Sequence, residues 1–417
     1  MITLVEALNY RCLKYIRHSL TPFQVLVGPN ATGKTTFLDV IAFLGDLVSH
    51  GLEAAVSQRV NNPVDLTWWR NEDSFELAIE ALIPEKIRKV LENPAFDRIR
   101  YEVAVGMDVD GQGIGIMKER VLLKIKGNRI EPQRELFPHL QNVPASILSR
   151  KGLSRKQQSV VVSKEQGGNE NFYPETPKGY KPSYPSKPRR VAFANLPPDE
   201  KEYPVSLWFK DYLASGIQQF ILNSLEIRKA SPPKQIPGFK PDGSNIPWVI
   251  ERLKENDPER FTEWVEHLQT ALPDLVGIRT IERKDDKHRY MMLQYRGGLE
   301  VPSWLASDGT LRLLALTLPA YLREFRGCYI VEEPENGIHP RAVETVVQSL
   351  SSVYEAQVLM ATHSPVVLSD VDVSQVLCLA KTEDGATDIV RGDRHPKLKD
   401  WKGAPNLSVL FAGGVLG

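Results

Sequence analysis

One short stretch of the sequence combines residue types and spacing that bind phosphate. Residues 28–36 read GPNATGKTT and match the pattern G-x-x-x-x-G-K-[ST], between an apolar run and a segment of helical spacing. Glycines let successive backbone N–H groups point inward, and the start of the helix adds a partial positive charge. We expect the Lys34 ammonium to reach the β and γ phosphates of ATP and the Thr35 hydroxyl to bind Mg²⁺. The expected ATP-binding residues are Gly28, Pro29, Asn30, Ala31, Thr32, Gly33, Lys34, Thr35 and Thr36.

Two adjacent carboxylates follow a second apolar run, CYIV at residues 328–331. Buried charges are costly unless they are paired or bound to a metal, so a purely structural explanation of this pair is weak. We expect Glu332 to be the acid associated with Mg²⁺. Glu333 would orient or deprotonate the water that attacks the γ phosphate.

A histidine follows a third apolar run, because LMAT at residues 359–362 leads directly to His363. Alone, such a histidine is more often a satisfied core or cap residue. In the company of a phosphate loop and two carboxylates, it is expected to hydrogen-bond the γ phosphate or the water. Glu333 and His363 are therefore the catalytic candidates.

The surrounding pattern supplies the elements that must position these residues. Apolar segments at 3–13 and 23–27 predict two strands, and helical spacing at 35–48 predicts a helix directly after the phosphate loop. From residue 290 onward, short strands and helices alternate in an α/β manner. Three more segments predict an antiparallel β meander, at 74–83, 99–109 and 114–125.

The middle of the chain differs in composition. Residues 132–204 are rich in Pro, Gly, Lys and polar residues with little periodicity, which predicts a loop region. Within it, residues 150–190 hold ten Lys/Arg against three Glu, a local charge of +7. A solvated loop is the simpler explanation, and a surface that contacts the DNA backbone is the more specific functional explanation. Helical patterns follow at 206–227 and 247–272. The aromatic residues that could stack on bases are Phe172, Tyr173, Tyr180 and Tyr184.

The totals exclude several classes of protein. Lys+Arg and Asp+Glu both number 52, so bulk charge gives no argument about nucleic acid. The three cysteines, Cys12, Cys328 and Cys378, lie too far apart for a zinc knuckle or a disulfide framework. The N-terminus lacks a cationic start followed by an apolar run, and no apolar stretch approaches the roughly 18 residues that span a bilayer. No membrane association is expected, and the expected compartment is the cytoplasm.

Four motifs in order resemble those of an ABC-type ATPase of the SMC, RecF and OLD-like branch. They are the Walker A loop at Gly28, LASDGTLRLLALTL at 305–318 as the signature, VEEPENG at 331–337 as Walker B, and ATHSP at 361–365 as the histidine switch. The sequence resembles bacterial and archaeal AAA family ATPases whose ATPase domain is split by a long insert. The resemblance covers residues 1–130 and 285–385.

The resemblance implies an α/β fold, a P-loop NTPase of the ABC-ATPase head type. Its mixed sheet core would be joined by the antiparallel β meander and a large α/β and loop insertion. Residues 1–130 and 285–417 would form the two parts of the head, and residues 131–284 the insertion. The resemblance also implies a homodimer, or a larger homo-oligomer, that closes around ATP. Ser307, Asp308 and Gly309 would then contact the γ phosphate held by the partner.

Three positions depart from the pattern of these relatives. The usual Walker B aspartate is Glu332 here, which is one methylene longer, so its metal contact could run through water and turnover could be slow. Gln58 is only a weak candidate for the glutamine that links the metal to the rest of the head. His339 stands where many relatives have an aspartate that crosses the dimer interface.

Three functions remain open. The first is an ATP-driven switch that controls a separately encoded, nuclease-like effector in a prokaryotic defence or genome-maintenance system, and family analogy favours it. The second is a RecF- or SMC-like DNA-binding repair ATPase, with DNA contacted through residues 150–190. Long heptads and a zinc hook are missing, but clamping by the basic stretch stays open. A transporter head fits poorly, since 298 residues separate Lys34 from Glu332.

The third function is an OLD-like nuclease with its own catalytic site. Such a site needs a further domain after the histidine switch, and only 54 residues follow His363. Two D-x-D strings occur, at 108–110 and 370–372, but turn chemistry explains both. An intrinsic nuclease is therefore the least favoured of the three functions.

Overall fold

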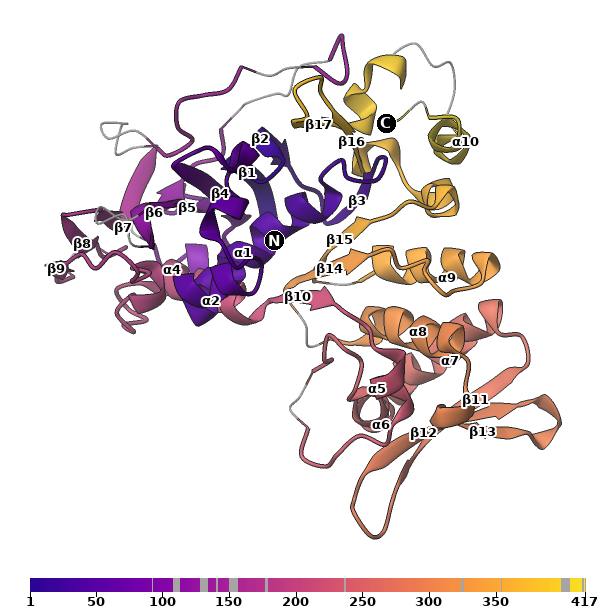
Figure 1. Cartoon of the computed structure of the whole chain (residues 1–417). Coiled ribbons are helices and arrows are strands. Elements are labelled where there is room, and N and C mark those ends of the chain that lie inside the picture. Colours follow the sequence, from indigo (N-terminus) through magenta and orange to yellow (C-terminus); the bar gives the residue numbers. More distant parts are fainter. Residues whose placement is uncertain are drawn as a thin grey trace.

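In a computed structural model, the described residues form three β-sheets and the helices that cover them (Figure 1). Two large sheets share a layer of helices, and a small sheet lies at one end of the molecule. Among the described residues, none of the helices is long and apolar enough to cross a membrane. The described residues are 1–91, 93–107, 113–127, 134–139, 142–149, 157–176, 179–235, 238–323, 326–353, 355–398, 406–414 and 416.

A six-stranded sheet positions the predicted site. Its order is β10-β14-β15-β3-β16-β17, and every neighbouring pair is parallel except the last. The central strands β3, β14 and β15 are mostly apolar and almost entirely buried, as expected for parallel strands covered on both faces. The bounds are β3 Phe23–Val27, β10 Ile217–Phe220, β14 Cys328–Glu332, β15 Gln357–Ala361, β16 Val376–Lys381 and β17 Thr387–Arg391.

An eight-stranded antiparallel sheet, in the order β2-β1-β4-β5-β6-β7-β8-β9, contains the predicted meander as β4, β5 and β6. The first predicted strand is β1, and the chain then turns back into β2, a strand that the sequence did not predict. The bounds are β1 Ile2–Tyr10, β2 Leu13–Ser19, β4 Ser74–Leu82, β5 Arg98–Met107, β6 Ile114–Lys124, β7 Gln158–Glu165, β8 Asn169–Phe172 and β9 Ser183–Pro185.

The loop predicted within residues 132–204 is wrong for its described part, because β7, β8 and β9 extend the meander sheet there. Some of the charged residues that suggested a solvated loop form ion pairs with one another in this sheet region. Lys164 is buried against Glu170 at 3.3 Å, and Arg190 also reaches Glu170 at 3.3 Å. Of the aromatic residues, Phe172 is fully buried and cannot stack on a base, whereas Tyr180 is 77% exposed.

The helical prediction for residues 206–227 is also corrected, since the pattern covers helix α4 (Pro204–Ser215), strand β10 and helix α5 (Ser224–Arg228). Strand β10 pairs with β14 at the edge of the six-stranded sheet. Residues 131–284, expected to form an insertion, thus contribute strands to both large sheets. The second helical stretch is two helices, α6 (Ile246–Asn256) and α7 (Pro258–Ala271).

The two faces of the six-stranded sheet pack into two separate cores. On one face, helix α1 (Lys34–His50) lies with α4 between this sheet and the meander sheet. On the other face lie α6, α7, α8 (Asp308–Thr317), α9 (Pro340–Ser351) and α10 (Leu407–Ala412). Leu407, Leu410 and Leu416 are buried in this second core, so the described part of the apolar C-terminal segment packs on its own domain.

The remaining elements are short or peripheral. Strands β11, β12 and β13 form the small antiparallel sheet beside α6 and α7. Their bounds are Leu275–Glu282, Arg289–Tyr295 and Glu300–Pro302, and those of α2 and α3 are Leu52–Ser57 and Glu85–Arg88.

Candidate nucleotide-binding site

The predicted phosphate loop connects the carboxyl end of β3 to the first turn of α1. Three of its residues have positive φ: Gly28 at 152°, Ala31 at 63° and Gly33 at 98°. A side chain at Gly33 would also meet neighbouring atoms, because its Cβ would lie 2.5 Å from the Thr387 hydroxyl oxygen and 2.9 Å from Cys12 Sγ. Both the backbone angle and the packing therefore require glycine at this position.

Lys34 is nearly buried, and its ammonium donates to carbonyl oxygens of the loop itself. Nζ lies 2.8 Å from Gly28 O and 3.0 Å from Pro29 O. Burial lowers the pKa of Lys34 to about 8, although the nearby carboxylates of Glu333, Glu332 and Glu335 act in the opposite direction. The side chain therefore sits at the bend where phosphate oxygens could replace the two carbonyl oxygens.

The expected metal ligands meet at the start of α1. The Thr35 hydroxyl donates a hydrogen bond to Glu332 Oε2, and Gln219 Nε2 donates to Glu332 Oε1 at 3.3 Å. A hydroxyl, a carboxylate and a side-chain amide supply the hard oxygen ligands that suit Mg²⁺, which is usually held by one or two carboxylates together with substrate phosphates. The residues present thus fit this metal.

Glu333 lies just past the end of β14 with a strained backbone. Its φ is 47°, which is uncommon for a residue with a side chain, and its N–H donates to Ala361 O at 2.8 Å. Asn336 donates to Glu333 Oε2, and Oε1 lies 3.9 Å from His363 Nε2. Strain of this kind often occurs at functional sites, and here it aims a half-exposed carboxylate at the same place as His363.

A carboxylate that the sequence analysis did not single out fixes the position of His363. Glu335 Oε1 accepts from the Thr362 hydroxyl at 2.7 Å and from the His363 backbone N–H at 3.0 Å. Because β14 and β15 are adjacent parallel strands, Glu335 and His363 leave the sheet side by side. The phosphate loop follows the carboxyl end of β3, Glu333 and Glu335 follow that of β14, and His363 follows that of β15. Ligands of parallel sheets bind at this edge.

The signature residues form the N-terminus of α8. Ser307 is the N-cap, and its hydroxyl accepts from the Thr310 N–H at 3.1 Å. Asp308 pairs with Arg228 at 2.7 Å. A Cβ at Gly309 would lie 2.7 Å from Gly337 O, so α8 and the segment after Walker B touch closely. Helix α8 packs on α5, α7 and α9 in the second core, on the opposite face of the six-stranded sheet from α1 (Figure 1).

The structure does not bring every candidate to this site. Gln58 is an exposed residue at the end of α2, and the glutamine that does reach Glu332 is Gln219. The exposed His339 caps α9 by accepting from the Arg341 N–H at 3.3 Å. Asp372 caps a short 3-10 helix in a capping box, which is the expected turn chemistry. The other D-x-D string, 108–110, lies outside the described residues.

The fold is similar to that of several solved structures. One is an Smc head bound to the C-winged helix domain of ScpA, with a TM-score of 0.52, 14% identity, and coverage of 93% of this chain and 97% of that chain. Another is an Smc head domain with an extended coiled coil, bound to the C-terminal domain of ScpA from Pyrococcus furiosus. Its TM-score is 0.51 at 14% identity, covering 93% of this chain and 95% of that chain. At such identities the likeness shows the fold alone, which is that of an Smc head domain.

Sequence comparison adds the family. No curated protein matches the chain. A family model described as "AAA domain, putative AbiEii toxin, Type IV TA system" matches residues 23–369, which is most of the chain. The expected resemblance is thereby confirmed, and the protein belongs to this family of AAA domains.

Proposed function

We propose that this protein binds ATP with Mg²⁺ and hydrolyses it to ADP and phosphate. The observation that carries the proposal is the convergence of Lys34, Thr35, Glu332, Glu333 and His363 at the carboxyl ends of three adjacent parallel strands. A phosphate loop alone would indicate nucleotide binding. The strained Glu333 beside His363 adds the groups that hydrolysis needs.

Each residue then has a distinct task. Lys34 exchanges its bonds to Gly28 O and Pro29 O for phosphate oxygens, and its protonated form balances their charge. Thr35 and Glu332, with Gln219, would hold Mg²⁺, which would neutralise negative charge that develops on the phosphate groups. Glu333 accepts a proton from, or orients, the attacking water, and His363 donates a hydrogen bond to the γ phosphate or the water.

We further propose that ATP holds two copies of the chain together. Ser307 and Asp308 are exposed at the N-terminus of α8, which favours an anion. Helix α8 lies on the opposite face of the six-stranded sheet from α1, the helix that begins at the phosphate loop of the same chain. The γ phosphate of ATP held by the partner chain would then contact Ser307, Asp308 and Gly309 at the N-terminus of α8. Opening of the dimer after hydrolysis would make the protein a conformational switch.

As the biological role, we propose control of a separately encoded, nuclease-like effector in the cytoplasm. The family description names a putative toxin of a toxin–antitoxin system, which is compatible with a system of two genes. In this scheme residues 1–130 and 285–417 form the head, and residues 131–284 supply elements that a partner could contact.

A DNA-binding repair ATPase is the second candidate. Tyr180 and Tyr184 are exposed at 77% and 46% near β9, in the stretch where basic residues outnumber acidic ones. However, Arg189 pairs with Glu53 at 2.6 Å and Lys164 with Glu170, so part of the positive charge is already neutralised. These pairs favour the first role.

The test compares the parent with Glu333→Gln, using Glu344→Gln on the exposed side of α9 as a matched control. Mass by light scattering is measured with and without ATP and Mg²⁺, and phosphate release is measured with and without duplex DNA. We expect Glu333→Gln to lose turnover and to accumulate as an ATP-bound dimer or larger assembly, with Glu344→Gln like the parent. Unchanged turnover in Glu333→Gln would contradict the proposed mechanism, and strong stimulation by DNA would favour the repair role.

A further inference from the structure

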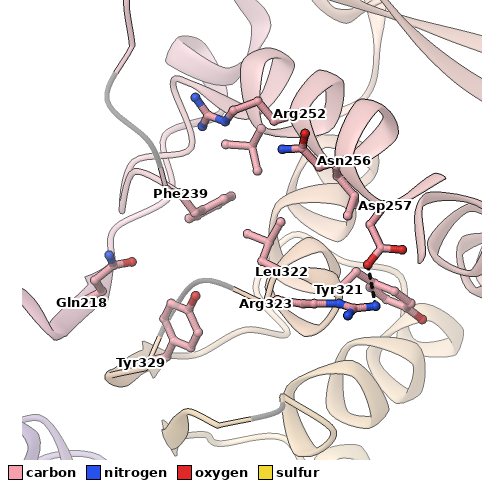
Figure 2. Close-up of a pocket in the computed structure, with 12 residues that line it drawn as sticks. Gln218, Phe239, Arg252, Asn256, Asp257, Tyr321, Leu322, Arg323 and Tyr329 are labelled. Carbon is pink, nitrogen blue, oxygen red and sulfur yellow. Dashed lines mark ion pairs between the residues drawn. The ribbon is translucent and has the colours of Figure 1, made fainter. Parts of the chain in front are cut away.

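A cavity of about 450 Å³ lies on the opposite face of the six-stranded sheet from helix α1. Figure 2 shows the side chains that line it. Helix α6 forms one wall, strands β10 and β14 another, and residues 321–323 a third. Much of the lining is apolar or aromatic: Phe239, Val249, Leu253, Leu322 and Tyr329. A volume of this size accommodates a small organic molecule.

Two polar groups face this cavity without a partner among the described residues. Arg252 on α6 has a buried Nη2, and Gln218 on β10 has a buried Oε1, and neither atom makes a hydrogen bond within the described parts of the chain. The other charges of the lining are already paired, because Arg323 contacts Asp257 at 2.8 Å (Figure 2). Unpaired buried polar atoms are costly, so a ligand that satisfied both would be favoured.

We propose that this cavity is a regulatory site for a small aromatic anion that also carries a hydrogen-bond donor. The anionic group would contact the Arg252 guanidinium, and the donor would contact Gln218 Oε1. The ring would lie between Phe239 and the side chains of β14 and residues 321–323, which supply aromatic and aliphatic surface. This site is separate from the one that holds ATP.

The strand β10 connects the cavity to the nucleotide site. Successive side chains of a strand point to opposite faces, so Gln218 faces the cavity while Gln219 reaches Glu332 on the other side. Phe220 follows Gln218 on the cavity side and packs edge-on against Tyr329 of β14. A ligand that fixes Gln218 therefore restrains the strand whose next residue contacts the expected metal ligand. This coupling rests on the proposed function, whereas binding in the cavity does not.

Binding is tested with anilinonaphthalene sulfonate, a fluorescent dye that has an aromatic body, an anionic sulfonate and one N–H donor. We expect saturable binding at one site per chain. Arg252→Gln should weaken it about tenfold or more, since it removes a charged hydrogen bond. Lys254→Gln, which removes a charge from an exposed position of the same helix, should bind like the parent. Leu322→Trp should fill the cavity and block the dye.

The variants are compared by circular dichroism and thermal unfolding, so a loss of binding counts only in a folded protein. Dye that binds Arg252→Gln and Leu322→Trp as tightly as the parent would overturn the site. Coupling between the cavity and the nucleotide site is tested by repeating the dye titration in the presence of ATP and Mg²⁺. Their presence should change the dye affinity by about fivefold or more. An unchanged dye affinity, with ATP binding shown separately by a fluorescent ATP analogue, would overturn the regulatory role. Failure to bind that analogue would instead contradict the proposed function and leave the dye result standing.

Discussion

The Thr35 hydroxyl donates a hydrogen bond to the Glu332 carboxylate, although the two residues are 297 positions apart in the chain. The pairing arises because β3 and β14 flank β15 in one parallel sheet and end at the same edge. Residues that meet in this way can share one Mg²⁺. We therefore expect the two side chains to act together in metal-dependent binding.

Thr35→Val keeps the size of the side chain but removes the hydroxyl, so it should weaken ATP binding in the presence of Mg²⁺ about tenfold or more. Binding without Mg²⁺ should change much less. Thr35→Ser keeps the hydroxyl and is the control. Isothermal titration with and without Mg²⁺ measures the difference, and an equal loss in both conditions would argue against a metal contact.

His363→Ala should reduce the turnover number on the order of 10²-fold while leaving ATP affinity nearly unchanged, because its bond is expected to matter most in the transition state. Glu335→Ala should cause part of the same loss, since Glu335 only positions the histidine through its backbone N–H. The double variant should be no slower than His363→Ala. Additive losses in a phosphate-release assay would show that Glu335 acts independently.

ATP affinity should fall as pH rises above about 8. Burial holds the pKa of Lys34 near 8 in the nucleotide-free protein, and bound phosphate raises the pKa again by stabilising the charged form. Below pH 8 the lysine is charged in both states, so it contributes no pH dependence. Above pH 8 binding must take up a proton, and the association constant should drop by about tenfold per pH unit. Lys34→Gln should bind weakly and lack this slope.

Gly309→Ala should lower the free energy of unfolding by about 1–3 kcal/mol, because the added methyl group would lie too close to Gly337 O. Gly127→Ala is the control, since among the described residues no atom beyond its immediate chain neighbours lies within 4 Å of the Cβ that it would add. Urea unfolding followed by circular dichroism compares them. Equal stability of the two variants would mean that α8 and the segment after Walker B can move apart to accommodate the methyl group without a loss of folding free energy.

The strongest sequence signals predicted the centre of the molecule. The phosphate loop and the acidic end of β14 combine an apolar strand pattern with the residues of a known motif. The meander combines three apolar strand patterns with a turn signal. All three elements lie at the predicted positions of the chain. Strand β10 was missed because it is only four residues long and follows α4 after a single glycine, too short to interrupt a helical pattern. Gln219 was missed with it.

The basic region was misread for a different reason. The run SVVVS at 159–163 is rich in β-branched residues, yet the surrounding Pro, Gly and Lys residues masked this strand signal. Buried pairs such as Lys164 with Glu170 depend on strands that are adjacent only in the folded sheet. Local composition cannot reveal such a pair, so it overstated the exposed charge.

The shared ATP site is tested most directly by mixing two inactive variants. Lys34→Ala disables the phosphate loop, and Ser307→Arg disables the signature of the same chain. If each site joins the loop of one chain to the signature of the other, an equal mixture forms mixed dimers with one intact site. Hydrolysis should then recover to roughly a quarter of the parent rate, the statistical expectation for random pairing of two-fold dimers. A mixture no faster than the mean of the two variants would contradict the account.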